Sequence, residues 1–197
     1  MRLHSFGIST DGSESTVLAL TSRTCGEGVT TVAFKLACEL AKEGNTLLVD
    51  ASPEGKRITD ILKVEAVSLA IKDINRINPQ TKRYITKLTD PNLDIITISD
   101  SDKEGNNPSD FNLPFWMELR SYYKSIIVDT GSLQKSPSRI WSNWVDHTLL
   151  VIDATSTTKE ILERFSSDLS TWNLKISGFI INKRSFHIPN FLLSMVR

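Results

Sequence analysis

Short apolar runs alternate with segments of helical periodicity along the chain. The runs are rich in Val, Ile and Leu and are nearly continuous, as is typical of strands buried on both faces of a parallel sheet. We expect six such strands, at Thr16–Thr21, Thr46–Asp50, Leu93–Ser99, Ser125–Asp129, Thr148–Asp153 and Ile176–Asn182.

The segments between these runs have the apolar spacing of helices that bury one face. The clearest, Thr30–Glu43, carries a stripe of Ala and Leu and is followed by Gly44, a common helix stop. The polar stretch 100–112 predicts a surface loop. The β-α-β alternation predicts a doubly wound, three-layer α/β/α domain with a mainly parallel sheet and right-handed crossovers. The other helices are expected at Leu113–Lys124, at Thr157–Trp172 and, in two pieces, at Ile58–Asn75.

Composition narrows this picture to one ordinary globular domain. The chain has 197 residues, 40% of them hydrophobic and 23% charged, so we expect a single domain over 1–197, with terminal extensions at 1–15 and 184–197. The 23 basic and 23 acidic residues cancel, which argues against nucleic acid as a partner. Two cysteines, three scattered histidines and the lack of a long apolar run argue against a disulfide framework, a zinc site, a signal peptide and a membrane span. We therefore expect a cytoplasmic protein.

A glycine-bearing turn joins the first predicted strand to the first predicted helix, where α/β folds bind phosphate. Gly26 and Gly28 would leave backbone N–H groups open to an anion. Thr30 and Thr31 begin a helix whose N-terminal dipole favours negative charge. A tight turn that only connects strand and helix is an equally good interpretation of this segment alone.

The full phosphate-loop pattern is G-x-x-x-x-G-K-[ST]. When it is aligned on Gly28, Arg23 stands at the first glycine and Val29 at the lysine, while Thr30 keeps the hydroxyl that binds magnesium. Two predicted strands end in Asp50 and Asp129. Because the carboxyl ends of parallel strands share one edge of the sheet, both carboxylates are expected beside the loop, where acidic residues hold magnesium in nucleotide hydrolases.

Three segments carry a family resemblance: TSRTCGEGVTTVAFKLACELAKEGNTLLVDAS, SYYKSIIVDTGS, and WVDHTLLVIDATSTTKEILERFSSDLSTWNLKISGFIINK. They are similar to the phosphate loop and A′ strand, the Walker B strand and the last strands of bacterial tyrosine kinases (BY-kinases) of capsule and exopolysaccharide assembly. Those kinases belong with the division-site and plasmid-partition ATPases. The resemblance covers about residues 17–183 and implies a P-loop NTPase-like fold.

The resemblance also implies a set of site residues. Thr30, Asp50 and Asp129 would hold the Mg²⁺ of bound ATP or ADP. Asn182 would read the base, with strand-end capping as its other interpretation. The implied phosphate loop consists of Gly26, Glu27, Gly28, Val29, Thr30 and Thr31.

The chain departs from the family pattern at chemically important positions. Val29 replaces the phosphate-loop lysine, Ser52 the second A′ aspartate and Ser132 the Walker B proline, and the chain ends NFLLSMVR in place of a tyrosine cluster. A lysine–phosphate charge pair is worth on the order of 4 kcal/mol at an effective dielectric near 20, so nucleotide is expected to bind weakly or not at all. Arg23 could reach back to supply the missing charge; a solvent-exposed arginine is its other interpretation.

These departures predict a catalytically degenerate BY-kinase-like protein of polysaccharide biosynthesis and export. It would act by binding a membrane-bound co-polymerase, or by oligomerising, and be recruited by its partner to the inner face of the membrane. Two alternatives stay open: a slow partition or positioning ATPase that still binds ATP weakly, and a module that binds a non-nucleotide anion in the loop.

A few other residues have two interpretations. Trp141 and Trp144 are candidates for a partner surface, whereas Trp116 fits a core stripe. The basic pair Lys183–Arg184 would contact a partner or membrane, or be a solvated strand end. Cys25 is either a reactive thiol at a helix N-terminus or a small residue in place of the family's proline.

Overall fold

One sheet dominates the computed structural model, which describes residues 15–53, 57–70, 74, 81–88, 92–99, 113–134, 144–171 and 174–184. The strand order is β3-β5-β2-β6-β1-β7-β8, with all of these pairs parallel, and β4 pairs antiparallel with β5. The strands are β1 (Thr16–Ser22), β2 (Thr46–Asp50), β3 (Ser68–Ala70), β4 (Ile85–Lys87), β5 (Leu93–Ser99), β6 (Ser125–Ser132), β7 (His147–Asp153) and β8 (Gly178–Asn182).

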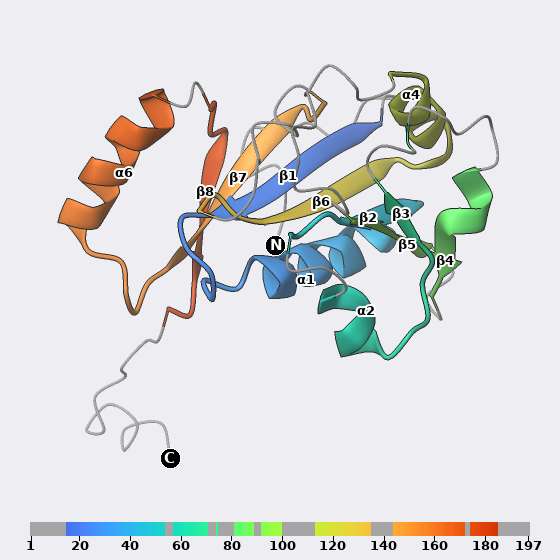
Figure 1. The fold of residues 1–197 in the computed structure, drawn as a ribbon, viewed down its shortest axis with the longest axis horizontal. Coiled ribbons are helices and arrows are strands. Elements are labelled where there is room, and N and C mark those ends of the chain that lie inside the picture. The colour runs from blue at the N-terminus through green and yellow to red at the C-terminus, as the bar shows by residue number, and fades with distance from the viewer. Residues whose placement is uncertain are drawn as a thin grey trace, which may run out of the picture.

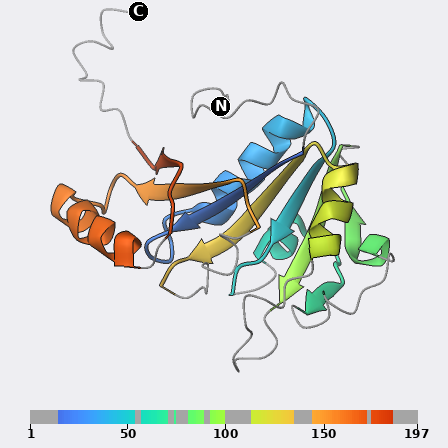
Figure 2. The ribbon, with the colours of Figure 1, turned by 90° about the horizontal axis from the view of Figure 1, so that it is seen from above.

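Helices lie on both faces of this sheet (Figures 1 and 2). α1 (Val29–Ala41) and α2 (Arg57–Leu62) are on one face and α4 (Leu113–Tyr122) is on the other, while α6 (Lys159–Thr171) lies beside the β7–β8 end. A short 3-10 turn, η2 (Thr81–Tyr84), precedes β4. The arrangement confirms the expected α/β fold with a mainly parallel sheet.

The core explains why the strand sequences are continuously apolar. In β1, Leu18 and Leu20 pack with the Ala/Leu stripe of α1, and Val17 and Ala19 pack with α4 on the opposite face. Because successive side chains of a strand point to opposite faces, a strand covered on both sides needs apolar residues at every position. Trp116 is 1% exposed in the α4 layer, as its core stripe predicts.

The structure confirms the six predicted strands, with small shifts of their ends, and adds two more. The helical prediction over Ile58–Asn75 is wrong at Ser68–Ala70, which forms β3 on the edge of β5. Three residues are too few to show strand periodicity, and the pairing with β5 decides their conformation. β4, also three residues long, was not predicted for the same reason.

Other sequence expectations concern surface features. Trp144 is half-buried and packs against the α4-side core, so the structure gives it a packing role. Trp141, Trp172, the loop 100–112 and most of the two terminal extensions lie outside the described residues. None of the helices in the described ranges is long and apolar enough to cross a membrane.

Candidate functional site

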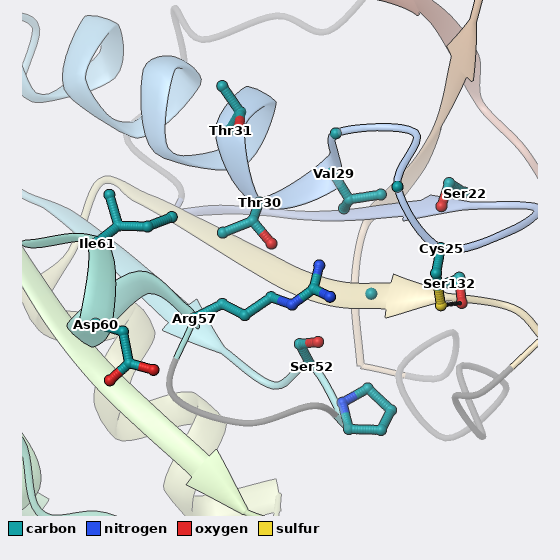
Figure 3. A pocket seen from close by; sticks show the side chains of 14 residues that line it. Ser22, Cys25, Val29, Thr30, Thr31, Ser52, Arg57, Asp60, Ile61 and Ser132 are labelled. Carbon is teal, nitrogen blue, oxygen red and sulfur yellow. Dashed lines mark hydrogen bonds between the residues drawn. The ribbon is translucent and has the colours of Figure 1, made fainter.

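A pocket of about 420 Å³ opens at the carboxyl edge of the central strands (Figure 3). Its walls are the β1–α1 loop, the segment from the end of β2 into α2, and the end of β6. The register pairs β1 with β6 and β6 with β2, which brings these three chain segments together. The pocket therefore lies where the sequence places the phosphate loop.

The β1–α1 loop has the backbone of a tight glycine turn. Gly26 and Gly28 have φ of 88° and 95°, a region that favours glycine. Gly28 is the N-cap of α1, and its carbonyl accepts the first helical bond from the N–H of Val32 (3.0 Å). Val29, at the lysine position, is 6% exposed, packs in the α1-side core and lines the pocket. The turn thus has the backbone that a phosphate loop would need, with an apolar residue at the position where the pattern has lysine.

Glu27 stabilises the loop from within. Its side chain is buried, and Oε1 accepts hydrogen bonds from the backbone N–H (3.0 Å) and the hydroxyl (2.7 Å) of Thr24. Both bonds involve a carboxylate, and such charge-assisted bonds are stronger than neutral ones. Glu27 therefore folds the loop and, among the described residues, is not part of the pocket lining.

The end of β8 holds the loop from outside. The Asn182 Nδ2 donates to the carbonyl of Glu27 (2.8 Å), and the Lys183 Nζ donates to the carbonyl of Gly26 (2.8 Å) and to Asp153 Oδ2 (2.7 Å). The capping interpretation of Asn182 thus has direct support, while base recognition stays a prediction. Lys183 and Arg184 are exposed at the strand end, as the solvated interpretation implies, and the Lys183 ammonium is in addition bonded to the loop and to Asp153.

Asp50 and Asp129 lie opposite one another in the β2–β6 register, and both are fully buried. Asp50 accepts hydrogen bonds from the N–H groups of Ile58 (3.1 Å) and Ser52 (3.4 Å). Burial raises the pKa of Asp50 to about 6; the charge of Asp129 adds to the rise and the hydrogen bonds oppose it. Two adjacent buried carboxylates would repel each other when ionised, which favours a bound cation or proton.

The surroundings of Asp129 show how Mg²⁺ would be held. Burial raises the pKa of Asp129, against hydrogen bonds from the Thr30 side chain and from the N–H of Gly131 (3.0 Å). Its Oδ2 is buried without a hydrogen-bond partner in the described structure. Mg²⁺ is bound through one or two carboxylates together with hydroxyl, water and phosphate oxygens. Thr30, Asp129 and Asp50 therefore fit the Mg²⁺ that the sequence implies.

Sequence reasoning missed Arg57, the first residue of α2. Figure 3 shows its side chain extending across the pocket, between Thr30 and Ser52, toward Cys25 and Ser132. Its charge lowers the pKa of both buried aspartates. The position of Arg57 shortly after the A′ strand was the only signal in the sequence that it belongs to the site. The fold is needed to show that its side chain faces the β1–α1 loop.

Arg23 and Cys25 complete the loop. Within the described chain, Arg23 is not in the pocket lining, and its Nε is buried with no hydrogen-bond partner. The structure thus gives no support to Arg23 as the substitute for the lysine. Cys25 is exposed, and its Sγ is 3.1 Å from the Ser132 hydroxyl across the loop mouth.

Comparison with known proteins places this fold and site in a family context. The chain matches no protein-family model. It is 26% identical over 170 residues to the tyrosine-protein kinase YwqD of Bacillus subtilis, which covers 83% of this chain and 70% of the relative. The kinase domain of VpsO superposes with a TM-score of 0.69 and 25% identity, over 87% of this chain and 86% of that one.

Plasmid partition proteins form a second group of similar structures. A plasmid partition protein of Borrelia burgdorferi bound to AMPPNP superposes with a TM-score of 0.66 and 21% identity, over 93% and 82% of the two chains. The relatives in sequence are bacterial tyrosine kinases, and the plasmid partition protein shares the fold. The family resemblance seen in the sequence is confirmed.

Proposed function

We propose that this chain is a kinase-like component of capsule or exopolysaccharide assembly that does not transfer phosphate. It acts by binding a membrane-bound co-polymerase or a second copy of itself, with its phosphate pocket as a ligand site. The observation that carries the proposal is the pocket wall, where Val29 and Ser52 both line the cavity. These are the positions at which the family pattern places a lysine and a second aspartate.

The two replacements remove different parts of phosphoryl transfer. The lysine would stabilise the charge that develops on the transferred phosphoryl group, and fixed charges of this kind usually make the largest contribution to catalysis. An aspartate at position 52, where this chain has serine, would complete the metal shell or accept the proton of the attacking hydroxyl. Thr30, Asp50 and Asp129 would still hold Mg²⁺, which would supply positive charge to balance the phosphate groups of a ligand. The remaining residues support binding of a phosphate group and orientation of the loop.

A restoration experiment tests this proposal. The purified chain is incubated with γ-labelled ATP, Mg²⁺ and a Glu–Tyr copolymer as acceptor. We expect no phosphotyrosine above background from the natural chain and measurable phosphotyrosine from the double variant Val29→Lys/Ser52→Asp. Adding Asp129→Asn to the double variant is the control, and we expect it to abolish the signal again. Phosphotyrosine formed by the natural chain would contradict the proposal.

A second candidate is a positioning or partition-type ATPase. The Thr30 side chain, which acts on the pKa of Asp129, and the fold shared with a plasmid partition protein favour it. Dimerisation that depends on ATP distinguishes the two functions. Light scattering of the chain with and without ATP and Mg²⁺ would show a change from monomer to dimer only for the second candidate.

A further inference from the structure

Arg57 occupies the pocket from the side opposite the missing lysine. In a phosphate loop the lysine comes from the N-terminus of the helix after the loop, where this chain has Val29. The guanidinium of Arg57 comes instead from α2, beyond β2. Both residues line the same cavity, and Figure 3 shows the guanidinium between Val29 and Ser52, directed toward Ser132.

The surroundings of Arg57 identify the charge that it complements. The glycine turn and the N-terminus of α1 supply N–H groups, which favour an anion. On the other side, the charge of Arg57 reaches Asp50 and Asp129. A guanidinium in this position places its charge beside both the carboxylates and the loop, and its planar set of donors is of the kind that suits phosphate oxygens.

We propose that Arg57, the cation among the described residues that line this pocket, binds the diphosphate group of a ligand in place of the absent phosphate-loop lysine. The inference rests on the proposed function, in which the pocket binds without catalysing. Arginine forms paired hydrogen bonds with two oxygens of one phosphate group, which a lysine cannot do. Two lining serines, Ser52 and Ser132, add hydroxyl groups that suit phosphate oxygens.

The position of Arg57 also changes what the ligand would connect. A lysine next to the loop binds phosphate within one segment of chain. Arg57 belongs to α2, so a bound diphosphate would join the β1–α1 loop to the β2–α2 segment. Ile61, on the same short helix, is 63% exposed and lies at the pocket wall. The occupied pocket would therefore order α2 relative to the loop.

Calorimetry with pyrophosphate, ADP and AMP, each with and without Mg²⁺, tests the assignment on the full chain. We expect pyrophosphate and ADP to bind and AMP to bind at least tenfold more weakly. Binding of pyrophosphate as tightly as ADP indicates that the diphosphate alone is recognised, whereas tighter ADP binding adds a nucleoside contribution. Either result supports the assignment when Arg57→Ala lowers the affinity for both ligands at least tenfold and Arg57→Lys restores part of it.

Two further variants separate Arg57 from general charge effects. Lys35→Ala removes an exposed cation on α1 outside the pocket lining, and Arg23→Ala removes the cation that the sequence suggested. We expect both to bind within twofold of the natural chain. Equal affinity of Arg57→Ala and the natural chain, loss of binding only in Arg23→Ala, or no binding of pyrophosphate and ADP by the natural chain would overturn the inference. Phosphotyrosine formation would instead contradict the proposed function and leave the role of Arg57 standing.

Discussion

The pocket beside the β1–α1 loop has a β8 side, where β8 contacts the loop, and a β2 side, and their side chains have different roles. On the β8 side, Asn182 and Lys183 donate to backbone carbonyls of the loop, and Glu27 bonds to Thr24 within it. On the β2 side, Asp50 is fully buried and Arg57 extends into the cavity. The first side maintains the shape of the loop through contacts that need no ligand. The second side places buried carboxylates near an arginine, so its behaviour depends on protons, cations and anions.

This difference explains how a loop can keep its shape without its lysine. The turn is determined by two glycines with positive φ, by the Glu27 carboxylate and by the β8 end. None of these contacts includes the side chain at position 29. Replacing the lysine therefore alters the electrostatics of the pocket while the frame that holds it is preserved.

The largest effect on stability is expected from Gly28→Ala, which alters the loop where Asn182 of β8 contacts it. A Cβ at Gly28 would collide with the Asn182 Nδ2, and the φ of 95° strains any other residue. We expect the free energy of unfolding to fall by about 3 kcal/mol in urea denaturation. Gly26→Ala is the matched control, because its φ is 88° but no atom lies within 4 Å of the added Cβ. It should lose only about 1 kcal/mol, and equal losses in the two variants would show that the contact with Asn182 is unimportant.

The next largest effect on stability is expected at Asp50, on the β2 side of the pocket. Its pKa is raised from 3.8 to about 6, first by burial, so the folded state keeps a proton that the unfolded chain releases between these values. The stability from this group is therefore greatest below pH 4 and is lost as pH rises through about 6. Asp50→Asn should remove most of this dependence and raise the free energy of unfolding at pH 7 by up to about 2 kcal/mol.

Urea denaturation at pH 5 and pH 7 measures this effect. The natural chain should be more stable at pH 5 than at pH 7, and Asp50→Asn should narrow the difference. Asp60→Asn, which removes an exposed carboxylate of α2, should leave the difference unchanged. If Asp50→Asn has the same pH dependence as the natural chain, then hydrogen bonds and nearby positive charge fully offset the cost of burying the ionised Asp50 carboxylate at pH 7.

The sequence predicted the frame of the pocket better than its charges. Six strands, the glycine turn and the position of Asp50 at the end of β2 follow from local patterns: continuous apolar runs, glycine spacing and the last polar residue of a run. The expected end of a strand at Asp129 is wrong, because β6 continues to Ser132. β3 and β4 were missed because three-residue strands depend on pairing with β5.

Contacts between distant segments account for the other differences. Arg57 faces Val29 across the pocket and Lys183 reaches Gly26 only because β1, β2 and β8 end on the same edge of one sheet. Arg23, adjacent to the loop in sequence, was a plausible substitute cation, yet in the described structure it does not line the pocket. Proximity along the chain is thus a poor guide to which cation enters a site formed by three separate segments.

The smallest effect is expected from Asn182→Ala, and it tests whether the β8 side only maintains shape. The variant loses the bond to the Glu27 carbonyl, which should lower the free energy of unfolding by about 1 kcal/mol. Asn92→Ala is the matched control, since the Asn92 Nδ2 also donates to a backbone carbonyl, that of Ala41 (3.1 Å), far from the pocket. Both variants should lose similar stability in urea. If Asn182 only caps the loop, calorimetry should show ADP and GDP binding to the natural chain with equal affinity, and Asn182→Ala should weaken both equally. A selective loss of ADP affinity in Asn182→Ala, absent from Asn92→Ala, would show that the amide leaves the loop to read the base.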